Sequence, residues 1–370
     1  MVHSKKPKRV VIKIGSSSLT SLHGEVSRKK LEKLVDQVVS LKDEGMEVVL
    51  VSSGAVAAGY RKLGFIERPS SLPEKQAAAS IGQGLLMESY SELFLSHGYV
   101  ASQILITRTD FSNENRYYNM SNTINVLLER GIVPIVNEND TVTVDRLKFG
   151  DNDTLSAKVA ALINAHQLII LSDIDGLYTD NPSHNPDAVM LEHVTEITQS
   201  IEAAAKDSDS AVGTGGMKSK IDAVKISMAS GISTFLGKTD VPGILSDAVK
   251  GKARGTYFEN KPESANLDRK RQWIAFNSGP EGKIIIHQKA KEALLEGSKS
   301  LYTGDVQEVK GKFEHGAVVK IGDDSGEDIG VGIVNYSTEQ LQQGTDGKKK
   351  AIINREAFVC YYDFCIPASL

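Results

Sequence analysis

Short apolar runs alternate with helical patterns along the first two-thirds of the chain. Runs of three to five mostly aliphatic residues predict buried strands, and apolar residues spaced three or four positions apart predict the helices between them. The predicted strands are residues 10–14, 48–51, 104–106, 132–136 and 168–171. The clearest helical stripes comprise Leu31, Leu34, Val35, Val38 and Leu41, and then Leu155, Val159, Leu162 and Ile163.

This alternation predicts a three-layer αβα sandwich. Continuous apolar strands separated by helices are typical of a mainly parallel sheet that is covered by helices on both faces. In such sheets, ligands bind beyond the carboxyl ends of the strands. We therefore expect the chemistry of this chain in the residues that directly follow each apolar run.

The pattern changes near Lys261. Residues 261–273 (KPESANLDRKRQW) are polar and charged, which predicts a linker. Beyond Gly282, a strand at 284–286 and a short helix at about 289–295 come before strands punctuated by glycine, at 317–321 and 331–334. The C-terminal part therefore reads as a small β-rich second domain, a compact barrel or roll.

Composition adds limits to this picture. A chain of 370 residues favours two domains, and a net charge of −4 gives no overall attraction to nucleic acid or membrane. No apolar run approaches the roughly 20 residues of a membrane helix. The two cysteines, Cys360 and Cys365, form neither a disulfide framework nor a metal quartet. These features favour a reducing, cytoplasmic setting.

The first two strands end in candidate ligand-binding segments. Lys13 lies inside an apolar strand, where a charge is costly unless it is paired. Gly15 and Ser16 can bring a backbone N–H group and a hydroxyl to a phosphate, although an ordinary turn with the lysine reaching solvent fits as well. After the second strand, Ser53 begins a run of small residues. That run permits close approach by a ligand or by a neighbouring helix.

Two polar clusters follow the fourth strand, at residues 137–140 (NEND) and 150–153 (GDND). An Asn or Asp before a helix is usually an N-cap, but one cap needs only one side chain. A carboxylate can bind an ammonium group, and an Asn amide can serve a carboxylate or an amine. Asp140, Asn152 and Asp153 are therefore candidates, and a carboxylate here can also hold lysines in place.

Residues 214–220 (TGGMKSK) open a further helix, and Ser172 and Asp173 follow the fifth strand. Acids are preferred at a helix start because it carries partial positive charge, so lysines there indicate a bound anion. Lys218 and Lys220 are about 200° apart around the axis, so one should serve the site and the other face solvent. GKT at 237–239 lacks the spacing of a P-loop, which excludes a Walker-type ATPase.

Taken in order, these segments resemble the amino acid kinase family. The stretches that carry the resemblance include VIKIGSSSL, VSSGAVAAG, PIVNENDTV, KFGDNDTLSAKVA, LSDIDGLYT and GTGGMKSKIDAVK. The C-terminal part resembles a PUA domain, a small β-barrel. The resemblance implies an amino acid kinase domain over 8–258, a linker over 259–281 and a PUA domain over 282–365.

The resemblance also implies an activity. The segments are most similar to the branch of the family that transfers phosphate from ATP to the side-chain carboxylate of L-glutamate, in the first step of proline biosynthesis. It further implies Mg²⁺ on the nucleotide phosphates, proline as a feedback inhibitor and a homodimer or homotetramer. A glutamyl phosphate reductase is the implied functional partner, and RNA binding by the PUA domain stays open.

Individual roles follow from the same resemblance. Lys13 and Lys220 are expected to flank the transferring phosphoryl group, with Asp153 holding both lysines. Among the substrate positions, Asp140 suits the α-ammonium, and the other two, Ser53 and Asn152, suit carboxylates. The expected ATP-binding positions are Lys13, Gly15, Ser16, Ser172, Asp173, Thr214, Gly215, Gly216, Met217, Lys218, Ser219 and Lys220.

Three other functions compete with this one. The first is another kinase of the same family, acting on aspartate, acetylglutamate, carbamate or a nucleoside monophosphate. The second is an RNA-binding or RNA-modifying protein led by its PUA domain, which the mixed charges near Lys320 and Asp323 argue against. The third is an inactive regulator, which the intact set of Lys13, Asp153 and Lys220 argues against.

Overall fold

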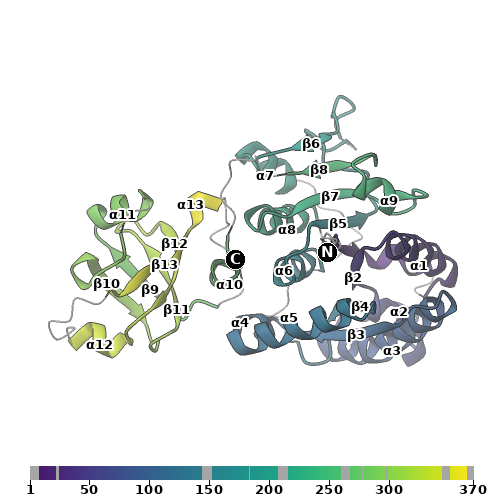
Figure 1. Ribbon diagram of the computed structural model, residues 1–370, viewed down its shortest axis with the longest axis horizontal. Coiled ribbons are helices and arrows are strands. Elements are labelled where there is room, and N and C mark those ends of the chain that lie inside the picture. The colour runs from purple at the N-terminus through teal and green to yellow at the C-terminus, as the bar shows by residue number, and fades with distance from the viewer. Residues whose placement is uncertain are drawn as a thin grey trace, which may run out of the picture. The chain divides into compact units, whose positions relative to one another are not determined.

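The computed structural model divides into two compact units (Figure 1). One comprises Met1–Asp110 with Asn115–Ser264, and the other comprises Phe111–Glu114 with Ala265–Leu370. The structure describes residues 8–21, 25–143, 152–182, 184–206, 216–259, 267–276, 279–296, 299–343 and 351–364.

An eight-stranded sheet forms the centre of the first unit, in the order β3-β4-β2-β1-β5-β7-β8-β6. Every neighbouring pair is parallel except β7 and β8, so the predicted mainly parallel sheet is confirmed. The five strands expected from the sequence are β1 to β5. The strands are β1 (Arg9–Ile14), β2 (Glu47–Ser52), β3 (Ala101–Ile106), β4 (Val133–Glu138), β5 (Gln167–Ser172), β6 (His193–Val194), β7 (Ser233–Lys238) and β8 (Thr256–Phe258).

Helices cover the two faces of this sheet. Helices α1, α3 and α9 pack together on one side, and α6 and α8 pack together on the other, where α6 lies against β1. The helices are α1 (Arg28–Asp43), α2 (Ala55–Gly59), α3 (Leu72–Ser96), α4 (Arg108–Ser112), α5 (Glu114–Glu129), α6 (Asn152–Leu162), α7 (Gln199–Lys206), α8 (Met217–Ala229) and α9 (Ile244–Val249).

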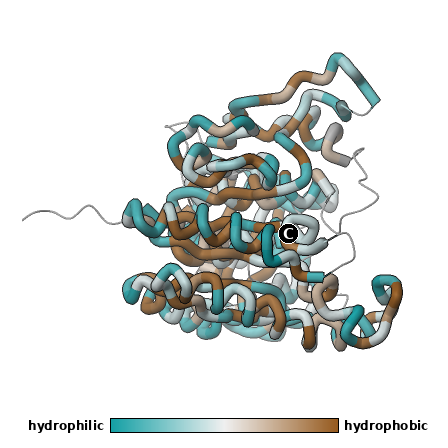
Figure 2. Tube along the Cα trace, turned by 90° about the vertical axis from the view of Figure 1, so that its right-hand side faces the viewer, coloured by the Kyte–Doolittle hydropathy of each residue, from teal (hydrophilic) through white to brown (hydrophobic). Residues whose placement is uncertain are grey.

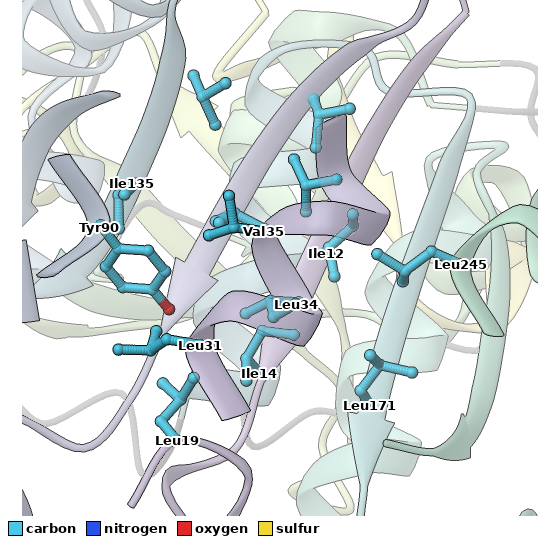
Figure 3. Close-up of a cluster of buried hydrophobic side chains, with 14 of the residues drawn as sticks. Ile12, Ile14, Leu19, Leu31, Leu34, Val35, Tyr90, Ile135, Leu171 and Leu245 are labelled. Carbon is cyan, nitrogen blue, oxygen red and sulfur yellow. The ribbon is translucent and has the colours of Figure 1, made fainter. Parts of the chain in front are cut away.

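Strand β1 decides which side chains reach which face. Ile12 and Ile14 enter the buried cluster formed with Leu31, Leu34 and Val35 of α1 (Figure 3). Successive side chains of a strand point to opposite faces. Lys13 therefore points to the face that α6 covers. Along the helices of Figure 2, hydrophobic and polar positions alternate, as expected of elements with one buried side.

The small residues after β2 serve helix packing. A Cβ atom added to Gly59 of α2 would lie 1.9 Å from the carbonyl oxygen of Ala78, and one added to Gly82 of α3 would lie 1.8 Å from that of Ala55. The two backbones can approach this closely only because both positions are glycine. Gly54, which begins α2 with a φ of +99°, needs glycine for its left-handed conformation.

The second unit contains a five-stranded sheet in the order β10-β9-β11-β12-β13, which confirms the predicted β-rich domain. Its β9–β11 pair is parallel and the other pairs are antiparallel. The strands are β9 (Gly282–Ile286), β10 (Val306–Gly311), β11 (Val318–Gly322), β12 (Asp328–Val334) and β13 (Ile353–Cys360). The helices are α10 (Arg269–Phe276), α11 (Gln288–Leu295), α12 (Thr338–Gln343) and α13 (Tyr361–Phe364).

Part of the polar stretch expected to be a linker is a helix. Residues 269–276 form α10, and its last five residues are buried. The indole nitrogen of Trp273 donates a hydrogen bond to the backbone oxygen of Phe111 at 2.9 Å. Because α10 begins with charged residues, its sequence resembles a polar linker, although the C-terminal half of the helix is mostly apolar. The expected linker over 259–281 therefore contains a helix, and its bounds stay a prediction.

Candidate active site

Two buried lysines share one buried aspartate where β1, α6 and α8 meet. The Nζ atom of Lys13 lies 2.6 Å from Oδ1 of Asp153, and that of Lys220 lies 3.2 Å from Oδ2. The exposed fraction is 7 % for Lys13, 4 % for Lys220 and 0 % for Asp153. Helices α6 and α8, which carry Asp153 and Lys220, are far apart in the sequence, and their labels lie close together in Figure 1.

The cluster consists of two ammonium groups and one carboxylate. Burial tends to raise the pKa of Asp153, but the ammonium groups of Lys13 and Lys220 outweigh burial and lower that pKa below its usual value. The carboxylate therefore stays ionised, and one negative charge faces two positive ones. Two ammonium groups placed together at the carboxyl end of β1 can attract an anion such as a phosphate.

Helix α8 presents its lysines as the spacing predicts. Lys220 is buried at Asp153, whereas Lys218, two residues earlier, is exposed. The hydroxyl of Ser219 donates to Oδ2 of Asp153 at 3.1 Å and lies 2.8 Å from the backbone oxygen of Gly216, which precedes the helix. The start of α8 is thereby tied to the start of α6. Of the predicted positions in this segment, Thr214 and Gly215 lie outside the described residues.

Hydroxyl groups join the carboxyl ends of three strands. The side chains of Ser18, after β1, and Thr239, after β7, lie 2.8 Å apart. Thr239 also donates to the backbone oxygen of Ser172, which ends β5, at 3.0 Å. Ser172 in turn donates to Oδ1 of Asp173 at 2.9 Å. Thr239 was not expected here, although a hydroxyl directly after an apolar strand is a signal that could have identified it.

The predicted substrate positions Ser53 and Asn152 are in contact. The amide nitrogen of Asn152 donates to the backbone oxygen of Ser52 at 2.7 Å, to Oγ of Ser53 at 2.9 Å and to Oδ1 of Asn137 at 3.0 Å. Asn152 and Asp153 are consecutive in the first turn of α6. The contact with Ser53 therefore lies directly beside the lysine cluster.

Asp140 lines a cavity of about 260 Å³ at the ends of β3 and β4. Ser80 and Gln83 of α3 line the same cavity. Gln83 accepts a hydrogen bond from Asn137 at 2.9 Å. Gln83 was not among the candidates, because its position on a long helix gives no sequence signal for a contact 54 residues away.

The predicted positions Gly15 and Ser16 follow Lys13 and Ile14. A Cβ atom at Gly15 would lie 3.8 Å from Nζ of Lys13, so this backbone runs beside the cluster. Among the described residues, no group of three or more acidic, histidine or cysteine side chains is placed to hold a metal ion. In the same part of the chain, no helix combines the length and apolar character of a membrane span.

Comparison with known proteins identifies the class. The model of the amino acid kinase family matches residues 8–238, and that of the PUA domain matches residues 282–356. A carbamate kinase from Giardia lamblia bound to AMP-PNP has the same fold, with a TM-score of 0.50 and 19 % identity, over 69 % of this chain and 99 % of that one. The chain therefore belongs to the amino acid kinase family and carries a PUA domain.

Close relatives narrow this assignment. The chain is 64 % identical to glutamate 5-kinase 2 of Bacillus licheniformis over 97 % of this chain and 98 % of that protein. It is 65 % identical to glutamate 5-kinase 2 of Bacillus subtilis over 98 % of both. Within the amino acid kinase family, it groups with the glutamate 5-kinases.

Proposed function

We propose that this chain transfers the γ-phosphoryl group of ATP to the side-chain carboxylate of L-glutamate, the first step of proline biosynthesis. The observation that carries this proposal is the sharing of Asp153 by Lys13 and Lys220. It places two ammonium groups at the carboxyl end of β1, where an anionic ligand can bind. The glutamate 5-kinases that the chain resembles support glutamate as the acceptor.

The chemistry needs positioning and charge stabilisation more than proton transfer. A glutamate carboxylate, with a pKa of about 4.3, is already ionised at neutral pH and needs no general base. One carboxylate oxygen attacks the γ-phosphorus, the bond to the bridging oxygen of ADP breaks, and L-glutamyl 5-phosphate forms. Lys13 and Lys220 offset the repulsion between the two anions and the charge of the transferring group.

ATP is the phosphoryl donor of a kinase of this family. Its phosphates would contact Gly15 and Ser16 after β1, and its nucleoside would lie near Ser172 and Asp173 after β5. The backbone N–H groups at the start of α8 add donors for phosphate. Mg²⁺ would be held mainly by the phosphates and water, and it supplies further charge neutralisation.

The amino acid would lie near Ser53 and Asp140. The carboxylate of Asp140, at the cavity beside α3, suits the α-ammonium. The oxygen of Ser53 accepts a hydrogen bond from Asn152, so its own proton is directed to another acceptor. A carboxylate of the substrate is such an acceptor.

Further properties belong to the same proposal. Proline, which resembles a cyclised glutamate, would compete for the amino acid site near Asp140. A homodimer or homotetramer is expected, and a glutamyl phosphate reductase would consume the product. The PUA domain is the part of the chain in which RNA binding can be tested.

The decisive experiment measures ADP release with Mg-ATP and hydroxylamine, which traps an acyl phosphate. L-glutamate is compared with L-aspartate, N-acetylglutamate and UMP. Release that depends on glutamate and yields γ-glutamyl hydroxamate supports both the acceptor and the carboxylate nucleophile. Release with another acceptor keeps the kinase and contradicts glutamate, and release with none contradicts the activity.

A further inference from the structure

Four side-chain amides form a continuous chain from β3 to the first turn of α6. Nε2 of Gln83 donates to Oε1 of Gln103 at 3.3 Å, and Oε1 of Gln83 accepts from Nδ2 of Asn137 at 2.9 Å. Oδ1 of Asn137 accepts from Nδ2 of Asn152 at 3.0 Å. We call Gln103, Gln83, Asn137 and Asn152 the amide chain.

Backbone groups fix the direction of the amide chain. The Asn152 amide faces the backbone oxygen of Ser52 at 2.7 Å, and because that oxygen can only accept, the facing atom must be nitrogen. Oδ1 of Asn137 accepts from the backbone N–H of Glu138 at 2.9 Å, so that atom must be oxygen. Nδ2 of Asn137 then has to find an acceptor, which Gln83 supplies.

This direction leaves one atom of Asn152 for a ligand. The two N–H bonds of its amide already serve three acceptors, the backbone of Ser52, the hydroxyl of Ser53 and the oxygen of Asn137. What remains is Oδ1, which accepts hydrogen bonds and cannot donate one. An ammonium group fits such an atom and a carboxylate does not. The geometry therefore favours a different ligand for Asn152 from the carboxylate expected at the sequence level.

We propose that Gln83 is a positioning residue that selects for the α-ammonium of the substrate. Acting through Asn137, it holds the carbonyl oxygen of Asn152 toward that ammonium group, alongside the carboxylate of Asp140. The proposal rests on the proposed function, since it assumes an α-amino acid as the acceptor. It predicts that discrimination between an amino acid and the corresponding plain diacid depends on a side chain of α3.

The physical reason lies in the burial of Asn137. Its side chain is nearly inaccessible, with an exposed fraction of 3 %, so water cannot easily replace a lost acceptor. Without Gln83, Nδ2 of Asn137 loses its acceptor, and the amide is no longer held in one orientation. Turning the amide over gives Nδ2 no acceptor, because it would then face the N–H groups of Glu138 and Asn152. Asn152 would then lose the acceptor that helps to fix its orientation.

The test compares L-glutamate with glutarate, which lacks the ammonium group, in wild type and Gln83→Met. Methionine has a similar length and favours helix, so α3 should be retained. We expect kcat/KM for L-glutamate to fall about tenfold, mainly through KM, which is the size of one charged hydrogen bond. The kcat/KM for glutarate and the KM for ATP should change by less than about twofold.

Two further variants separate positioning from simple damage to the fold. Gln83→Glu keeps an acceptor for Asn137, and Gln103 can turn its amide to donate to it, so the preference for glutamate should largely return. Gln37→Leu removes a glutamine of α1 that accepts from the backbone N–H of Leu245 at 3.3 Å, outside the amide chain. This matched control should leave the preference unchanged.

The outcomes distinguish this inference from the proposed function. If Gln83→Met lowers turnover of L-glutamate and glutarate equally, or lowers neither, Gln83 does not select for the ammonium group. If wild type uses both acceptors equally well, carboxylate phosphorylation stands and the selection is refuted. If wild type phosphorylates neither, the proposed function fails and the inference fails with it.

Discussion

Each of the two units contains a cluster of three charges, with opposite composition. In the first unit, one carboxylate, that of Asp153, is shared by Lys13 and Lys220. In the second unit, one lysine, Lys291 of α11, contacts Asp323 at 2.6 Å and Glu327 at 2.9 Å. The first cluster therefore contains two cations and one anion, and the second contains one cation and two anions.

The two clusters also differ in their access to water. The side chains around Asp153 are at most 8 % exposed, whereas in the second cluster Asp323 is 5 %, Lys291 17 % and Glu327 50 % exposed. Water and salt screen an exposed ion pair, so it contributes little to stability, and a local surplus of charge there costs little. Two ammonium groups placed together inside the protein can attract an anion such as a phosphate. The comparison therefore distinguishes a candidate ligand site from a structural ion-pair cluster, in which Lys291 connects α11 to the turn before β12.

The largest expected effect tests the role of the two cations, Lys13 and Lys220, in phosphoryl transfer. Lys220→Ala should lower kcat at least a hundredfold, roughly 2.7 kcal/mol of transition-state stabilisation, because one of the two cations at the phosphoryl group is lost. The folded structure should persist, since Lys13 still pairs with Asp153. Steady-state kinetics at saturating ATP and glutamate measures the change.

Lys225→Ala is the matched control for this variant. Lys225 is a buried lysine of the same helix, and it pairs with Glu202 of α7 instead of Asp153. This variant should lose stability yet keep kcat close to wild type, as judged from thermal unfolding and activity of the same samples. Near-normal turnover in Lys220→Ala, or an equal loss in Lys225→Ala, would contradict the assignment.

Removing the shared anion should have the next largest effect. Asp153→Asn leaves the ammonium groups of Lys13 and Lys220 buried without their carboxylate, so the free energy of unfolding should fall by about 3 kcal/mol. Misplaced lysines should also lower kcat by roughly tenfold or more. Urea unfolding combined with kinetics checks both effects. An unchanged midpoint would show that the lysines are held by other groups.

The amino acid side of the site should respond through KM. Asp140→Asn removes the negative charge expected at the α-ammonium, so the glutamate KM should rise about tenfold, the size of a charged hydrogen bond. The KM for ATP serves as the internal control and should not change. An unchanged glutamate KM removes Asp140 from the substrate site.

Much of this arrangement follows from local sequence rules. Apolar runs gave β1 to β5, and a lysine inside a strand predicts a buried partner because an unpaired charge there is costly. That partner is Asp153, so the burial argument selected between the two interpretations of Lys13. The half-turn between Lys218 and Lys220 likewise predicts one buried and one exposed lysine, as found.

Other parts depend on contacts that no local rule contains. Gln83 lies on α3, for which the sequence analysis names no candidate position, and its partner Asn137 is 54 residues away. Thr239 was dismissed together with a nucleotide motif that it does not form, yet its hydroxyl links β5 and β7. In both cases the contact depends on where the side chain points in the folded protein, and the spacing of residues in the sequence does not predict it.

A fourth buried lysine, Lys158 of α6, extends the comparison through its response to pH. Burial, with the nearby charge of Arg108, lowers the pKa of Lys158 from 10.5 to about 7. Between pH 7 and about 10 the unfolded chain binds more protons at this residue than the folded one, so stability rises with pH there, by up to about 1.4 kcal/mol for each pH unit. Lys158→Met should abolish this rise.

The measurement is urea unfolding at pH 7 and pH 9. Relative to wild type, Lys158→Met should be more stable at pH 7, and this advantage should shrink by roughly 2 kcal/mol at pH 9. A constant difference between the two proteins at both pH values would show that Lys158 keeps its proton throughout.

The smallest effect on turnover is expected in the second unit, at the cluster around Lys291. Lys291→Met removes the cation between Asp323 and Glu327, and hydrogen bonds from Lys291 currently raise its own pKa and lower that of Asp323. Asp323 keeps hydrogen bonds from the hydroxyl and backbone of Ser325, so the turn should survive. We expect kcat within about twofold of wild type and a small decrease in melting temperature that high salt reduces. A loss of turnover comparable to that of Lys220→Ala would contradict the interpretation that the cluster around Lys291 has only a structural role.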